Sequence, residues 1–239
     1  IQGLSFITLP IYTRVMTQED YGNYNLYGSW VGIFSIFIGL QITGSFSIAK
    51  IKYENRFKEY IATSTSVATI FFILFSAVCL ILSTYLEKIL GFSTGILIFI
   101  LIQGYFSHLQ GSLSQYYIQT QETKKQLVLS FFMSFGNVVL SLLFLFTLKN
   151  DFLARILGGV IPGIIVGIIF LIFIYRNSSV ILDKIYVRFI LLTSIPLVFH
   201  ILGHNLLSQL DRIMIGSYMT AKEVAIYSFG YSLGSIVSI

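Results

Sequence analysis

Six long runs without Asp, Glu, Lys or Arg constrain this chain more than any other feature. They cover residues 21–49, 60–86, 89–121, 126–148, 156–175 and 189–210. A helix needs about 20 apolar residues to cross a bilayer core, whereas strands of a membrane barrel would appear as alternating segments of about ten. Shorter uncharged runs lie at the two ends, 1–13 and 224–239. We therefore expect an all-α, polytopic membrane helix bundle with six complete spans and two partial ones, part of a longer protein.

The composition excludes several classes of protein. Of the 239 residues, 56% are hydrophobic and only 10% are charged, whereas a soluble domain is about one quarter charged. This argues against a soluble enzyme, a disordered tail and a nucleic-acid-binding module, although the net charge is +5. The single cysteine, Cys79, excludes a disulfide framework and a cysteine-based metal site within the chain.

The charges in the loops divide unequally between the two sides of the membrane. We call side A the side that carries loops 50–59, 122–125 and 176–188, and side B the side that carries the alternate loops. Side A has nine Lys or Arg and four Asp or Glu, whereas side B has six of each. Short cytoplasmic loops are enriched in Lys and Arg, so side A is expected to be cytoplasmic. The loop 176–188 is either an interfacial amphipathic segment or a plain connection.

The beginning of the chain repeats weakly near its end. When the sequence is shifted by 203 residues, Met16-Thr17 falls on Met219-Thr220 and Tyr24 falls on Tyr227, and positions 8–36 contain seven identities. Six spans separate the two copies, so both copies point in the same direction across the membrane. This predicts two parallel repeats related by an axis along the membrane normal, an arrangement found in transporters.

Two stretches resemble a known family of membrane transporters. Residues 9–24 (LPIYTRVMTQEDYGNY) contain an apolar-Pro step followed by Arg, Thr, an acidic residue, an aromatic residue and Gly. Residues 210–216 and 223–228 resemble the seventh helix and the start of the eighth helix of the same family. The family comprises the O-antigen and capsular-polysaccharide repeat-unit flippases of the multidrug/oligosaccharidyl-lipid/polysaccharide exporter superfamily.

The resemblance implies a fold, a cargo and a location. It implies a MATE-like transporter with two six-helix lobes, of which residues 1–188 form the first lobe and residues 189–239 begin the second. A member moves an undecaprenyl-diphosphate-linked oligosaccharide from the cytoplasmic to the periplasmic leaflet of the bacterial inner membrane without breaking a covalent bond. It works by alternating access, in some relatives coupled to a proton or sodium gradient. No enzyme activity, cofactor, metal or nucleic-acid partner is expected.

Two arginines are candidates for holding an anionic diphosphate. Arg14 ends the first helix, and Arg212, which follows Asp211, has a similar place before the last span. Arginine matches phosphate with paired hydrogen bonds. The alternatives are that Arg14 extends to the membrane interface and that Asp211 and Arg212 form a local pair at a helix end.

Polar residues also interrupt two of the spans. His200 and His204 share one helical face, with Gln209 and Asn205 close to it. This strip either lines a transport cavity or forms a helix–helix contact, and no third metal ligand accompanies the two histidines. In 89–121, Gln103 and Gln110 belong to a polar face that either lines the cavity or lies at the interface.

Other basic and small residues suggest structural roles. Arg155, at the start of its span, is interpreted as an interface anchor. The pair Gly158-Gly159, together with Gly163 and Gly167, indicates close helix packing.

Three other functions remain open at this point. A drug/cation antiporter of the same superfamily would favour acidic residues within the membrane, and the first six spans have none. A peptidoglycan-precursor flippase would have the same architecture. A membrane-embedded polysaccharide polymerase usually carries a large periplasmic loop, whereas the side B loops here are short.

Overall fold

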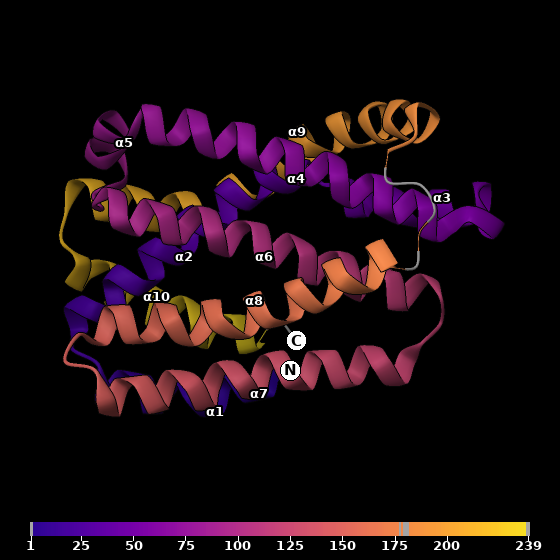
Figure 1. Ribbon diagram of the computed structural model, residues 1–239. Coiled ribbons are helices and arrows are strands. Elements are labelled where there is room, and N and C mark those ends of the chain that lie inside the picture. The colour runs from indigo at the N-terminus through magenta and orange to yellow at the C-terminus, as the bar shows by residue number, and fades with distance from the viewer. Residues whose placement is uncertain (1, 177, 179–181, 238–239) are drawn as a thin grey trace.

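The computed structural model describes residues 2–176, 178 and 182–237, although the side chains of residues 2–7 and 235–237 are outside this description. All regular structure in these residues is helical, and the long helices run side by side as a bundle (Figure 1). The elements are α1 (Gln2–Val15), α2 (Gln18–Gly39), η1 (Ile42–Ser45), α3 (Phe46–Lys52), η2 (Glu54–Arg56), α4 (Phe57–Ile81), α5 (Ser83–Leu90), α6 (Thr94–Gln119), α7 (Thr123–Thr147), α8 (Asp151–Arg176), α9 (Lys184–Tyr218) and α10 (Ala221–Val237).

The long helices agree with the expected membrane spans. Five described segments are long and apolar enough to cross a membrane, and a bent pair, α2 with η1 and α3, makes a sixth. Large apolar side chains such as Phe131, Phe135 and Phe146 on α7 are exposed on the outside of the bundle. Continuous apolar surface of this kind is unfavourable in water and suits contact with lipid. The all-α polytopic bundle predicted from the sequence is thus confirmed.

The second span is broken near its side A end, where the sequence had predicted one uninterrupted run, 21–49. Leu40 and Gln41 both have left-handed backbone conformations, with φ values of 46° and 50°. This conformation costs an L-residue with a side chain about 1 kcal/mol or more. It turns the chain by 53° between α2 and the segment Ile42–Lys52. Apolar composition cannot reveal such a break, because both halves are equally apolar.

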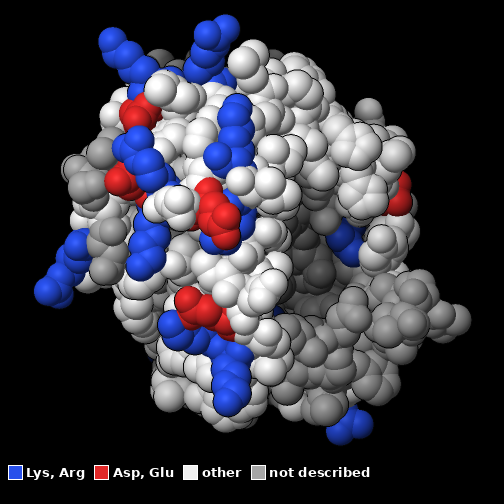
Figure 2. Space-filling model, turned by 90° about the vertical axis from the view of Figure 1, so that its right-hand side faces the viewer, with Lys and Arg blue, Asp and Glu red and all other residues white. Residues whose placement is uncertain are grey.

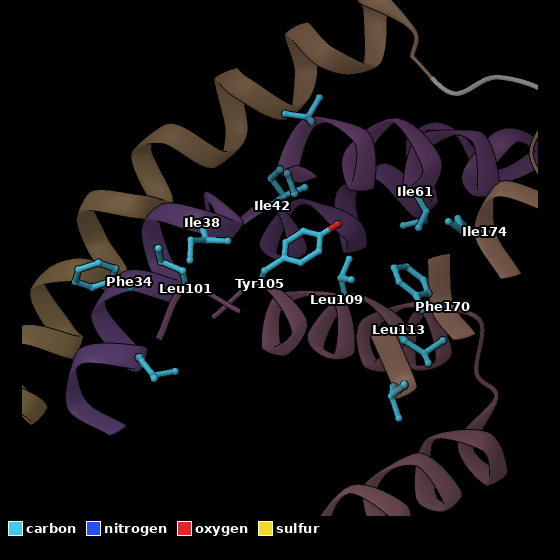
Figure 3. Close-up of a cluster of buried hydrophobic side chains, with 14 of the residues drawn as sticks. Phe34, Ile38, Ile42, Ile61, Leu101, Tyr105, Leu109, Leu113, Phe170 and Ile174 are labelled. Carbon is cyan, nitrogen blue, oxygen red and sulfur yellow. The ribbon is translucent and has the colours of Figure 1, made fainter. Parts of the chain in front are cut away.

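The main core lies between α2, α4, α6 and α8. Ile38, Ile61, Leu109 and Phe170 are completely buried there. Figure 3 shows these side chains, one or more from each helix, gathered in the same space. Since lipid is as apolar as these side chains, their contribution comes mainly from close packing rather than from removal from water.

Three helices pack around the N-terminal half of α2. Both α9 and α10 contact α2 extensively, whereas α1 touches α2 and α7 only lightly. A Cβ added at Gly22 of α2 would lie 1.7 Å from the carbonyl oxygen of Ala221 at the start of α10. The two backbones therefore approach so closely that only glycine fits at position 22.

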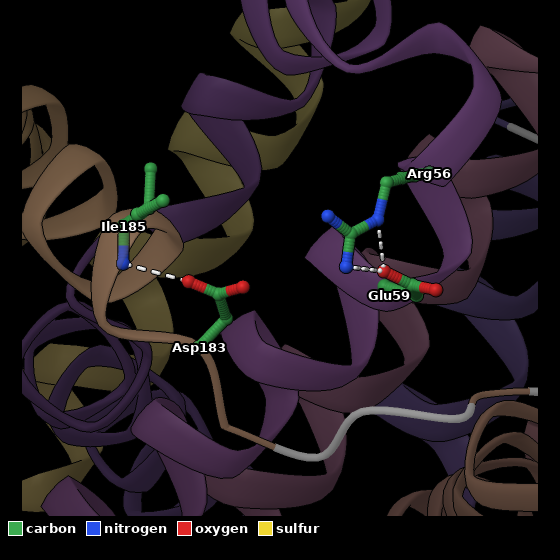
Figure 4. A network of polar contacts seen from close by, with 4 residues as sticks. All are labelled: Arg56, Glu59, Asp183 and Ile185. Carbon is green, nitrogen blue, oxygen red and sulfur yellow. Dashed lines mark hydrogen bonds and ion pairs between the residues drawn. The ribbon is translucent and has the colours of Figure 1, made fainter.

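Basic residues gather at the side A end. Figure 2 shows this end, with many Lys and Arg, fewer acidic residues, and a hollow to one side. Some of these charges are paired. The Nε of Arg56 donates to Glu59 at 2.6 Å, and Asp183 caps α9 by accepting from the Ile185 N–H at 2.7 Å (Figure 4). The hydrogen bond and charge of Glu59 raise the pKa of Arg56 above its usual value. The predicted interfacial stretch 176–188 lies partly outside the described residues, and its last five residues belong to α9.

Candidate functional site

The first part of the candidate site lies where α9 faces α2. Arg212 donates to the side-chain oxygen of Gln209 at 2.8 Å, and the same oxygen accepts from the Ser29 hydroxyl of α2 at 2.9 Å. The guanidinium of Arg212 also lies 4.7 Å from the ring centre of Tyr231 on α10. Three helices thus hold a half-buried arginine about 9 Å, or six residues, before α9 ends at Tyr218.

Asp211 does not neutralise its neighbour Arg212. It accepts a hydrogen bond of 2.6 Å from the Tyr227 hydroxyl on α10. No ion pair joins Arg212 to a carboxylate among the residues that the structure describes. The Nε of Arg212 is buried and has no hydrogen-bond partner among the described residues. A buried donor without a partner is unusual and often marks the place of a missing water, ion or ligand.

The second part of the site is centred on Arg155 of α8, which the sequence had suggested as an interface anchor. Its terminal nitrogen donates to Asn137 at 2.7 Å and to Ser141 at 2.6 Å, both on α7. Its guanidinium lies 4.1 Å from the ring centre of Tyr12 on α1 and 4.6 Å from that of Tyr24 on α2. Hydrogen bonds and stacking from three other helices hold this guanidinium, whereas an interface anchor would leave it free in water.

Close packing of α7 and α8 explains how Arg155 reaches its partners. A Cβ added at Gly158 would lie 2.1 Å from the Ser141 oxygen, and one added at Gly159 would lie 3.2 Å from the Asn137 amide nitrogen. These glycines bring the polar face of α7 against α8, next to Arg155. A signal for this site was present in the sequence, because Asn137 and Ser141 are four residues apart on one face of an otherwise apolar helix.

Both arginines lie near the same segment of α2. Arg155 stacks on Tyr24 of α2, and the Gln209 oxygen that binds Arg212 also accepts from Ser29 of α2. A cavity of about 360 Å³ opens beside Tyr21, between α1, α2 and α10. Helices α8 and α9, which follow each other in the chain, thus direct their arginines toward the side B half of α2. We call Arg155, Arg212 and the groups that bind them the arginine site.

The other candidates from the sequence are distributed more widely. Gln103 accepts a hydrogen bond from the Tyr27 hydroxyl of α2 at 2.6 Å. Asn205 bonds to the Ile201 carbonyl of its own helix. Gln110 is half-buried, and His200 and His204 are exposed on α9.

Arg14 differs from Arg212 in its surroundings. Its side chain is exposed in the last turn of α1, one residue before that helix ends. The two arginines, which seemed to hold similar places in the sequence, therefore lie at different depths.

The structure offers no metal centre within its described residues, because no group of three His, Cys, Asp or Glu side chains comes together there. The arginine site offers hydrogen-bond donors, positive charge and aromatic faces. It has no nucleophile with an adjacent base. Groups of this kind are suited to binding an anion.

Comparison with protein families identifies the chain. A family model described as polysaccharide biosynthesis protein matches residues 1–239. The chain belongs to this family. The resemblance found in the sequence to the polysaccharide-repeat flippases is thereby confirmed. Comparison with curated proteins and with solved structures gave no match. Membership of the family, with five to six membrane-spanning segments, makes the chain a polysaccharide-related membrane transporter.

Proposed function

We propose that the protein moves an undecaprenyl-diphosphate-linked oligosaccharide repeat unit across the membrane, from the side A leaflet to the side B leaflet. The cargo combines a lipid tail, an anionic diphosphate and a sugar head. In this proposal the arginine site holds the diphosphate, and no covalent bond is made or broken.

The observation that carries this proposal is the absence of carboxylate partners at the arginine site. Within the described residues, Arg155 and Arg212 are bound by amide, hydroxyl and aromatic groups alone. A cation at membrane depth is costly unless an anion compensates it. If the compensating anion belongs to the cargo, both arginines keep their full charge available for it. A drug/cation antiporter would need the opposite, an embedded acid without a partner.

The proposed mechanism uses two lobes, residues 1–188 and residues 189–239. Arg155 would belong to the first lobe and Arg212 to the second. Separation of the lobes would therefore change the contacts of a diphosphate bound between the two arginines. The contact between α2 and α10 supports this division. Gly22 and Ala225 correspond under the 203-residue shift, and Gly22 packs against Ala221, while Gln18 donates to the Lys222 carbonyl at 3.3 Å. Two repeats related by a twofold axis would meet through such equivalent segments.

The location of the arginine site supports the direction of transport. The hollow in Figure 2 opens on side A, which the excess of Lys and Arg assigns to the cytoplasm. Arg155 lies about 6 Å, or four residues, from the start of α8 on side B. A cargo that enters from side A would therefore meet the arginines near side B. We place the protein in the bacterial inner membrane, with a proton or sodium gradient as the energy source.

A deletion of the full-length gene in its native host tests the proposal. The position of lipid-linked repeat units is then followed with a sugar-specific probe that is admitted only to the periplasm. Accumulation of units on the cytoplasmic side, with loss of surface polysaccharide, is the expected result. If single units reach the periplasm but chains do not lengthen, the protein is a polymerase. Unchanged surface polysaccharide would favour a drug or peptidoglycan-precursor exporter instead.

A further inference from the structure

The break in the second span forms a cavity that is separate from the arginine site. The cavity has a volume of about 310 Å³ and lies between η1, α3, the end of α6 and the middle of α9. Its polar lining consists of Gln41, Thr43, Ser47, Gln115 and Gln119. Gln41 lies just after the end of α2, 20 residues from Tyr21, which corresponds to about 30 Å along a helix. A ligand in this cavity therefore occupies a different part of the protein from one at the arginine site.

The lining is polar but uncharged. Three carboxamides and two hydroxyls face the cavity, and none of these five side chains hydrogen-bonds to another group in the described part of the chain. Five charged residues of this end line another cavity, namely Lys50, Glu54, Arg56, Lys58 and Glu59. Five convergent polar side chains without protein partners are available to bond to a ligand that is itself polar and neutral.

The backbone at the break is strained in a way that creates the cavity. Leu40 and Gln41 are consecutive non-glycine residues in the left-handed region. Such a conformation persists only where the surrounding structure enforces it, and it often occurs at binding sites. Without the break, α2 would continue straight and Gln41 and Thr43 would not face Gln115 and Gln119.

We propose that this cavity binds a neutral sugar residue of the cargo as the head group enters from side A. Each sugar hydroxyl both donates and accepts, and each carboxamide offers both kinds of partner. Leu197 and Ile201 of α9 complete the wall and provide apolar surface for the C–H face of a sugar ring. Phosphate and acidic sugars would find no cation in the lining. We call the cavity the sugar pocket.

The two walls of the sugar pocket belong to segments that the proposed mechanism moves apart. Gly44 approaches Leu197 so closely that an added Cβ would lie 2.9 Å from its Cδ1 atom. Since α9 begins the proposed second lobe, separation of the lobes would open the sugar pocket. The sugar pocket would then bind the sugar in one conformation and release it in the other.

This inference rests on the proposed transport of a lipid-linked sugar, and its test separates the two. The full-length protein in nanodiscs is titrated with two lipids, polyprenyl diphosphate and the lipid-linked oligosaccharide extracted from the deletion strain. Wild type should bind the sugar-bearing lipid more tightly. The double variant Gln115→Ala, Gln119→Ala should lose about tenfold of affinity for that lipid and none for the sugar-free lipid, because it removes two sets of neutral hydrogen bonds.

Two further variants control for structural effects. Thr43→Val keeps the shape of the side chain and removes its hydroxyl, so it should reduce the same preference by a smaller factor. Gln126→Ala removes a carboxamide from α7 that bonds to Ser114 outside the sugar pocket, and it should leave the preference unchanged.

The outcomes are distinguishable. If both pocket variants keep the full preference for the sugar-bearing lipid, the sugar pocket is refuted while transport of the lipid stands. If wild type binds neither lipid, the proposed function fails, and the sugar pocket fails with it. A preference that is lost in the pocket variants and kept in Gln126→Ala supports the inference.

Discussion

Cations at the loops and cations within the bundle have different partners. At side A, Arg56 pairs with Glu59 and Lys125 pairs with Glu122, each three residues apart on the chain. Within the bundle, Arg155 donates to Asn137 and Ser141 of α7, and Arg212 donates to Gln209 of its own helix, whose side-chain oxygen also accepts from Ser29 of α2. The loop pairs are local and mostly exposed, whereas the bundle arginines depend on tertiary structure.

In the proposed function, loop and bundle charges have separate tasks. An exposed ion pair contributes little to stability, and the loop cations matter mainly for orientation in the membrane. A half-buried arginine without a carboxylate keeps its charge for another anion. The comparison can be tested with three kinds of variant. One removes the bundle arginines, one places a carboxylate next to a bundle arginine, and one alters a charge at a loop.

The largest effect is expected from removing the bundle arginines. The double variant Arg155→Ala, Arg212→Ala should reduce transport at least tenfold, since a hydrogen bond to a charged group contributes about 1.5–3 kcal/mol. Transport is measured as surface polysaccharide in a complemented deletion strain, at matched protein level. Arg155→Lys and Arg212→Lys should restore part of it, because charge returns without the paired donors.

The matched control is Arg56→Ala, which removes a cation from side A. Transport should stay within about twofold of wild type, because the lost interaction is an exposed pair. Arg14→Ala serves as the intermediate case, since Arg14 is exposed at the end of α1. Normal transport by the double alanine variant would remove both bundle arginines from the site.

A smaller but sharper effect is expected from Gln209→Glu. The new carboxylate would lie where the Gln209 oxygen now accepts from Arg212 at 2.8 Å, and would neutralise that arginine. Transport should fall several-fold while thermal stability is kept or increased, because a close ion pair replaces a neutral contact. Gln126→Glu makes the same change on α7 and should have little effect. Unimpaired transport by Gln209→Glu would contradict anion binding at Arg212.

The smallest effect concerns a loop carboxylate. Glu87 of α5 accepts from the backbone N–H and the hydroxyl of Thr94 at the start of α6, and these bonds lower its pKa. Its stabilisation is therefore complete above the ordinary glutamate pKa of about 4.3 and is lost as the pH falls through the lowered value. Glu87→Gln should slightly lower the melting temperature of the purified protein at pH 7. A difference that persisted undiminished at low pH would contradict this role.

The sequence predicted the spans well, whereas the roles of the site residues stay a prediction. Arg212 and Gln209 were chosen as candidates because polar residues are rare in an apolar helix, and the structure brings them together. The contacts of Arg155 were not predicted, because its position four residues into a span is also that of an interface anchor. Its partners come from α1, α2 and α7, and no local pattern around residue 155 shows them.

The sequence by itself determined the all-helical fold and the approximate positions of the spans, because a bilayer requires about 20 apolar residues for each crossing. It also determined membership of the family through two short stretches. Only the tertiary structure decided which arginines lose their solvent, where the second span breaks, and which polar groups converge at that break. These features depend on contacts between residues far apart in the chain, such as Arg155 with Tyr12 and Gly44 with Leu197. The pattern of apolar residues along the chain does not predict such contacts.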